Sequence, residues 1–116
     1  MPVRLYYPPV EDDWRPPQAR LRAALWEAER WLRVGSYAAA GAALDGIPVA
    51  ATADEAAVVR GLRLLAAAGY RRLEGDLERA ERLLTHARRE LEPRFPAYED
   101  VDLAELADVV ETALRS

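Results

Sequence analysis

The sequence predicts an all-α protein, a compact bundle of about five helices. Apolar residues recur at intervals of three and four along most of the chain, which is the spacing of one helix face. Glycines and prolines divide these periodic stretches into lengths typical of single helices, and no stretch is a convincing strand. The chain has 116 residues, of which 51% are hydrophobic, so it can bury one core without disulfides.

The first seventeen residues form a distinct leader. Five prolines fix φ and remove backbone donors there, so no long helix fits. Tyr6, Tyr7 and Trp14 are too apolar for a solvated tail. We expect an extended strap laid over the domain, or alternatively an arm that docks on a second subunit. The predicted organisation is a leader over residues 1–17 and a helical bundle domain over residues 18–116.

The bundle opens with a helix that starts at about Pro17 and a shorter helix that follows Gly35. Proline is favoured at a first helical position, and glycine is favoured just past a helix end. Ser36 can cap the second helix, which runs to about Leu44. The predicted inward positions of the two helices are Leu21, Leu25, Ala28 and Leu32, then Tyr37, Ala40, Ala43 and Leu44.

Thr52 and Glu55 have the spacing of a capping box, which predicts the start of a third helix. It continues to Leu73 and could be the central element of the domain. Asp76 then caps a fourth helix that runs to about Leu91. The predicted inward positions are Val58, Leu62, Leu65, Ala66, Gly69 and Leu73, then Leu77, Ala80, Leu84, Ala87 and Leu91.

The last helix starts after a connection that holds Pro93 and Pro96. Asp102 and Glu105 again have capping spacing. The helix that they open has Leu103, Leu106, Val110, Ala113 and Leu114 on its inward face.

Residues forty positions apart match in the two predicted hairpins. Gly35 corresponds to Gly75, and the expected cap Ser36 corresponds to Asp76. We interpret this as two successive hairpins, packed in the style of tetratricopeptide repeats and closed by a fifth helix. Two such units are too few for an open solenoid.

Composition excludes several kinds of chemistry. With no cysteine, the chain has no disulfide, no thiolate zinc site and no thiol nucleophile. All sixteen basic residues are arginine and asparagine is absent, which is typical of a GC-rich bacterial genome and suits a heat-tolerant host. No apolar run reaches the roughly 18 residues of a membrane span, and no signal peptide is recognisable. We expect a soluble cytoplasmic protein that does not bind membranes.

The chain offers no catalytic, cofactor or metal motif. The sole histidine, His86, is expected on the surface beside Glu90. A di-metal helix motif would need glutamate three residues before it, where Leu83 stands. The acidic clusters at 11–13 and 99–102 lack the spacing of a calcium loop, and no phosphate-binding loop is present. We therefore predict a protein that is not an enzyme.

Nucleic acid is a disfavoured partner. Residues 59–72 carry four arginines and no acid, but these arginines do not share one helix face. The whole chain has a formal net charge of −4, whereas nucleic-acid-binding domains are usually basic.

Two groups of residues are candidates for partner binding. Arg60 and Arg63 project from a helix that otherwise looks buried. They either pair with Glu27 or Asp45, or they recognise an acidic peptide or small anion. The aromatic group consists of Trp26, Trp14, Tyr6 and Tyr7. These residues either pack in the core or form an interaction patch or dimer contact.

The segment from about Leu25 to Leu114 resembles short helical bacterial and archaeal proteins of domain-of-unknown-function family 309. The likeness lies in three stretches, Gly35–Asp45, Val59–Tyr70 and Gly75–Leu84. The resemblance implies a helical fold and, in the family, facing polar residues that could form a polar network or metal site. This chain departs from that pattern, with Ala39, Gly41, Ala42, Arg60 and Tyr70 at the corresponding positions, and only Asp45 keeps its counterpart's character.

These observations favour a non-catalytic protein-interaction or scaffold module that acts as a monomer or homodimer. Two alternatives stay open at this point. One is a degenerate member of a metal-binding or enzymatic helical family, and the other is a nucleic-acid accessory protein.

Overall fold

The computed structural model describes residues 17–47 and 52–116 and confirms the predicted all-α class over those ranges. Its helices are α1 (Pro17–Arg33), α2 (Tyr37–Asp45), α3 (Ala53–Leu73), α4 (Leu77–Leu91) and α5 (Leu103–Leu114). Between α4 and α5 lie a short 3-10 helix, η3 (Glu92–Arg94), and two strands, β1 (Ala97–Tyr98) and β2 (Val101–Asp102).

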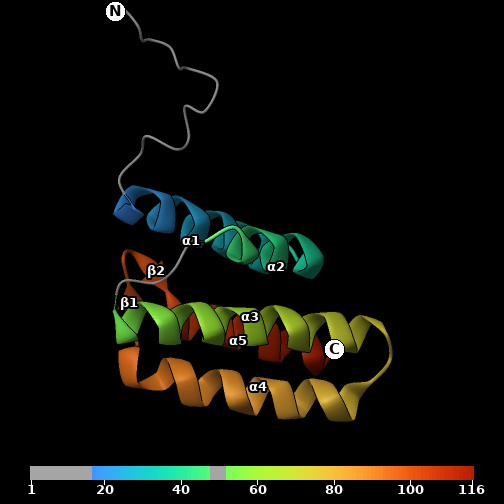
Figure 1. The fold of residues 1–116 in the computed structure, drawn as a ribbon. Helices are drawn as coiled ribbons and strands as arrows, with labels where there is room; N and C mark the ends of the chain where they lie inside the picture. Colours follow the sequence, from blue (N-terminus) through green and yellow to red (C-terminus); the bar gives the residue numbers. More distant parts are fainter. Residues whose placement is uncertain (1–16, 48–51) are drawn as a thin grey trace, which may run out of the picture.

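The helices are arranged as two antiparallel hairpins and a closing helix (Figure 1). The hairpin of α1 and α2 lies on one side of α3, and α4 lies on the other side. Helix α5 packs against α1, α3 and α4. Helix α3 is therefore central, in agreement with the sequence prediction.

The turns within the two hairpins have the same geometry. Gly35 and Gly75 have φ values of +79° and +88°, a left-handed conformation that glycine adopts without a steric penalty. The following residues, Ser36 and Asp76, each donate the backbone N–H to the carbonyl five residues earlier, at 2.9 Å in both turns. This is the Schellman pattern of helix termination. The predicted correspondence at an offset of forty residues is therefore also a correspondence of backbone structure.

Three of the four predicted helix caps form as expected. Thr52 and Glu55 make the complete capping box at the start of α3. The carboxylates of Asp76 and Asp102 accept the N–H groups three residues on, at 3.1 and 2.9 Å. Ser36 occupies the cap position of α2, but its side chain makes no capping hydrogen bond, so that prediction is corrected.

One contiguous core joins all five helices and β2. Most of the predicted inward residues are buried in it, including Leu25, Leu32, Leu62, Leu65 and Leu106, all at 0% exposure. Ala43 and Ala113 are only half-buried.

Leu73 and Leu77 were expected in the core, and this prediction is wrong. They are 61% and 51% exposed. The reason is geometric, since the turn between α3 and α4 extends beyond the ends of α2 and α5 in Figure 1. No described element is long enough to cover the two leucines there.

A small hairpin that the sequence did not predict precedes α5. Ala97 pairs with Asp102 and Tyr98 with Val101 in antiparallel register. The two turn residues, Glu99 and Asp100, have φ values of +51° and +68°. Two consecutive positive φ values define the type I′ turn, whose twist matches that of the flanking strands.

The predicted leader falls almost wholly outside the described residues. Only Pro17 is described, and it is the first residue of α1 rather than the last of the leader. Within residues 17–47 and 52–116, none of the helices has both the length and the apolar character needed to cross a bilayer.

Candidate binding groove between the first two helices

An open groove of about 840 Å³ runs along the surface where α1 meets α2. Small side chains form its lining on both helices and leave the surface hollow. The charged and aromatic side chains beside them all come from α1. The lining residues are Arg20, Ala23, Ala24, Trp26, Glu27 and Arg30 from α1, and Ala42, Ala43 and Gly46 from α2 and the residue after it.

The arrangement follows from two stripes on α1. The buried stripe is the predicted one, which holds Leu21, Leu25, Ala28 and Leu32. The groove stripe lies beside it at positions 20, 23, 27 and 30, again at intervals of three and four. Such spacing keeps side chains on one face along three turns of a helix.

Arg20 is the least satisfied side chain of the groove. Its Nε atom is buried and has no hydrogen-bond partner in the described structure. A buried donor without a partner costs free energy, more so on a charged group. The groove therefore contains a donor whose hydrogen bond a bound acceptor could complete.

Arg30 also differs from the other arginines of the described ranges. Its guanidinium lies over the ring of Trp31, 5.9 Å from the ring centroid. Neither Arg20 nor Arg30 forms an ion pair with any described carboxylate. Most described arginines do form one, namely Arg22, Arg33, Arg60, Arg63, Arg71, Arg79, Arg82, Arg88, Arg94 and Arg115.

Trp26 lies at the groove and is held from the other side by the β1–β2 turn. Its indole N–H donates to the carbonyl of Glu99 at 3.4 Å, and 47% of the side chain is exposed. Arg22, one turn earlier on α1, donates to the carboxylate of Glu99 at 3.0 Å. Of the described residues predicted to bind a partner, Trp26 is the one that the structure brings to the groove.

The two arginines proposed from the sequence lie elsewhere, on α3. Arg63 contacts Asp45 at 3.3 Å and donates to the carbonyl of Leu44 at 3.2 Å, which confirms one of its two predicted pairings. Arg60 contacts Glu90 of α4 at 3.2 Å, so its predicted partner, Glu27 or Asp45, is corrected. Both guanidiniums are therefore engaged within the bundle.

The other candidate residues predicted from the sequence either do not line the groove or fall outside the described ranges. Trp14, Tyr6 and Tyr7 lie outside the described residues. His86 is exposed, as predicted, but the carboxylate of Glu90 accepts from Arg60 rather than from the histidine.

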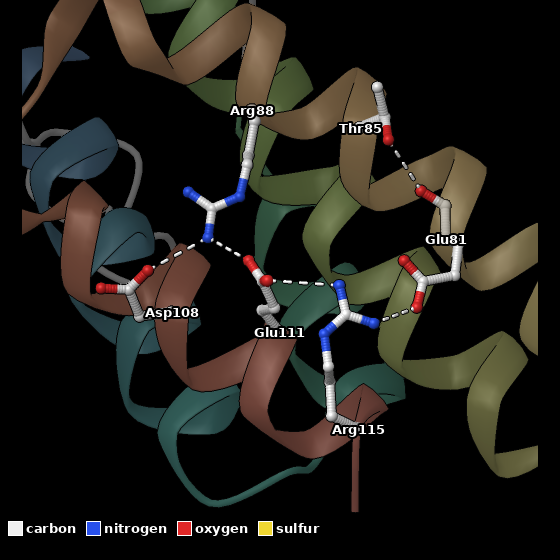
Figure 2. A network of polar contacts seen from close by, with 6 residues as sticks. All are labelled: Glu81, Thr85, Arg88, Asp108, Glu111 and Arg115. Atoms are coloured by element: carbon white, nitrogen blue, oxygen red, sulfur yellow. Dashed lines mark hydrogen bonds and ion pairs between the residues drawn. The ribbon is translucent and has the colours of Figure 1, made fainter.

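A second polar cluster joins α4 to α5 (Figure 2). Arg88 contacts both Asp108 and Glu111, and Arg115 contacts Glu111 at 3.2 Å and Glu81 at 2.6 Å. The hydrogen bond from Arg88 holds the pKa of the Glu111 carboxyl below its ordinary value. Because each charge in this cluster already faces an opposite charge, the cluster links the helices and has no free group for a ligand. The described residues contain no group of three or more potential metal ligands.

Fold and site together define a small helical bundle that carries an arginine-containing groove on its first hairpin. No protein-family model matches the chain, and neither a curated protein nor a solved structure shows significant similarity to it. Membership of family 309 therefore stays a prediction.

The sequence prediction missed Arg20 and Arg30. The signal was the second stripe on α1, which has arginines at both ends and Ala23 and Glu27 between them and faces another alanine-rich helix. That signal becomes recognisable only once the direction of α2 is known.

Proposed function

We propose that this protein is a non-catalytic protein-interaction module that binds an extended, acidic segment of a partner in the α1–α2 groove. The observation that carries the proposal is the pair of groove arginines, Arg20 and Arg30, that form no ion pair with a described carboxylate, with the buried Nε of Arg20 foremost. Most other arginines of the described ranges are ion-paired, whereas these two are positioned to receive carboxylates.

The chemistry of the groove fits such a segment. Guanidinium groups bind carboxylates through charge-assisted hydrogen bonds with fixed geometry. Arg20 and Arg30 are ten residues apart on α1, about 15 Å at the helical rise, which is the length of roughly five extended residues. Ala23 and Ala24 lie between them and leave room for a backbone or small apolar side chains, and Glu27 is the acid of the lining. The exposed face of Trp26 provides an apolar contact at the same surface.

A displayed library of random twelve-residue peptides, selected on the full chain, tests the proposal. We expect the enriched peptides to contain Asp or Glu, and to lose at least about tenfold in affinity for Arg20→Gln/Arg30→Gln, since a charged hydrogen bond contributes about 1.5–3 kcal/mol. The matched control is Arg82→Gln/Arg89→Gln on the exposed surface of α4, which should bind the peptides as the parent does. Failure to enrich any acidic peptide, or equal binding by both double variants, would overturn the proposal.

The other functional classes predicted from the sequence have separate tests. Stoichiometric metal in the purified protein would favour descent from a metal-binding or enzymatic family. Retention on heparin or duplex DNA that falls steeply with salt would favour a nucleic-acid accessory role. Light scattering after size exclusion would decide between monomer and homodimer. A cytoplasmic location in a bacterium remains part of the proposal, on the strength of the composition.

A further inference from the structure

We propose that the occupant of the α1–α2 groove in the free protein is the chain's own leader, residues 1–16. This inference rests on the proposed function, because it assigns a ligand to the same groove.

The leader and the groove carry opposite charges. The leader contains three consecutive acids, Glu11, Asp12 and Asp13, whereas the groove lining contains two arginines, Arg20 and Arg30, and one acid, Glu27, and so carries a net positive charge. The acids are flanked by Pro8-Pro9-Val10 on one side and by Trp14 on the other. This combination of acidic, proline and aromatic residues is the kind of extended segment that the groove is proposed to bind.

The leader is also long enough to reach both arginines of the groove. The leader joins α1 at Pro17, and Arg20 and Arg30 lie three and thirteen residues further along the helix, about 5 and 20 Å along its axis. The acids lie four to six residues before Pro17, so an extended chain carries them as far as about 13–20 Å from it. The carboxylates can therefore reach both arginines while the helices stay where they are.

A tethered ligand is also present at a high effective concentration, in the millimolar range for short flexible connections. The leader would compete with any acidic segment of a partner. If it covers the groove in nine molecules of ten, the apparent affinity for an added peptide falls about tenfold. The occupancy of the groove by the leader would thus determine the apparent affinity for a partner.

A spin label on the leader of the full chain tests the position directly. The protein has no cysteine, so Val10→Cys offers a single attachment site for a nitroxide. We expect the label to broaden the amide signals of Ala42 and Gly46, which line the groove. The matched control is Arg82 on the exposed surface of α4, which lies on the other side of α3 from the α1–α2 hairpin (Figure 1), and its amide signal should stay sharp. Equal broadening of both regions, or none, would overturn the proposal.

Two further measurements complete the test. Neutralising the acids in the labelled protein (Glu11→Gln, Asp12→Asn, Asp13→Asn) should abolish the broadening at the groove, and persistence would contradict the role of charge. A mixture of isotope-labelled protein without nitroxide and unlabelled protein with nitroxide shows only broadening between molecules, because the observed molecules carry no label. In this mixture the broadening should disappear. If it remains, the leader docks on a second copy, and the proposal of docking within one chain is wrong.

The outcome is separable from that of the proposed function. The neutralised leader variant should bind the selected acidic peptides more tightly than the parent, by up to about tenfold for the occupancy considered above. Peptide binding that depends on Arg20 and Arg30 but shows no leader broadening would preserve the proposed function and reject this inference. If the label on the leader broadens the groove signals but no acidic peptide is selected, this inference is preserved and the proposed function is rejected.

Discussion

At Gly69, the absence of a side chain allows α2 to lie close against α3. A Cβ atom built there would lie 2.3 Å from Cε1 of Tyr37, a ring that is itself buried. Gly41, in the middle of α2, has no atom within 4 Å of the corresponding position. The same chemical change at the two glycines therefore has opposite consequences.

We predict that Gly69→Ala lowers the free energy of unfolding by about 1–2 kcal/mol. Overpacking costs typically 1–3 kcal/mol, which outweighs the gain of up to about 1 kcal/mol from replacing glycine in a helix. Gly41→Ala keeps the gain without the clash and should raise the free energy by about 0.5–1 kcal/mol. Urea denaturation measures both. A Gly69→Ala variant as stable as the parent would show that Tyr37 can move.

Which side chain contacts which was the feature of the structure that the sequence predicted least well. Periodicity placed Gly69 on an inward face, but it contains no information about which ring lies opposite. Likewise, Arg60 was recognised as needing a carboxylate, and its actual partner, Glu90, lies thirty residues away on α4. Such pairings depend on the relative shift of two helices along their axes, which no local pattern in the sequence specifies.

At the scale of elements, the two hairpin turns differ only in their cap side chains. Ser36 and Asp76 have nearly the same backbone angles, with φ of −90° and −96° and ψ of 74° in both. Only the carboxylate of Asp76 accepts a capping hydrogen bond, from the N–H of Arg79. Equivalent backbone positions thus contribute unequally to stability.

We expect Asp76→Ala to lower the free energy of unfolding by about 1 kcal/mol, the usual cost of losing a cap. Ser36→Ala should change it by no more than a few tenths, because no capping hydrogen bond is lost there. Thermal unfolding followed by circular dichroism compares the two variants. Equal losses would mean that the hydroxyl of Ser36 does cap α2 in solution.

The α4–α5 cluster of Figure 2 predicts a dependence on pH. Since the pKa of Glu111 is lowered in the folded state, its contribution is present above the ordinary value of 4.5 and is lost as pH falls through the folded value. Glu111→Gln should therefore destabilise the protein at pH 7, by about 0.5–1 kcal/mol for a largely exposed network, and much less at pH 3. Glu78→Gln, whose partner Arg82 is 3.8 Å away on the exposed surface, is the control and should show almost no effect. A deficit of Glu111→Gln that is independent of pH would reject the explanation.

Helix boundaries were highly predictable, because caps and terminal glycines act within a few residues. Thr52, Asp76, Asp102 and the two turn glycines all occupy the expected positions. The β1–β2 hairpin was missed because its turn is Glu99-Asp100 rather than the Asn-Gly or Asp-Gly pair that usually marks a type I′ turn. Contacts from α1 to Glu99 help to hold this turn, and a local reading of the sequence cannot detect them.

At the scale of the whole molecule, a single core predicts a single unfolding transition. Buried residues of all five helices belong to one cluster, so neither hairpin has a core of its own. The three tryptophans lie at positions 14, 26 and 31, and their fluorescence reports on the first third of the chain. Fluorescence and circular dichroism should therefore give coincident urea transitions. An earlier fluorescence transition would mean that the α1–α2 hairpin detaches separately.

The fold class could be predicted from periodicity alone, whereas the groove could not. Its existence depends on alanines of α1 and α2 meeting across a hairpin, and on two arginines that form no ion pair with a described carboxylate although Glu27 lines the same groove. Both are properties of the assembled molecule. Among the described residues of the predicted partner-binding group, Trp26 lines the groove, whereas Arg60 and Arg63 link α3 to its neighbours.

The use of arginine in every described ion pair has a consequence at alkaline pH. Guanidinium groups keep their proton beyond pH 12, so raising the pH leaves the links between helices charged, whereas ammonium groups would lose theirs. Tyr98 is a described group that opposes folding there once it is ionised. Burial raises the pKa of its phenol above 10.0, and charge on Glu55 adds to the effect. The neutral phenol is thus compatible with the folded state until the solution becomes strongly basic. We expect the stability of the fold at high pH to be lost through ionisation of this ring and not through loss of any described ion pair.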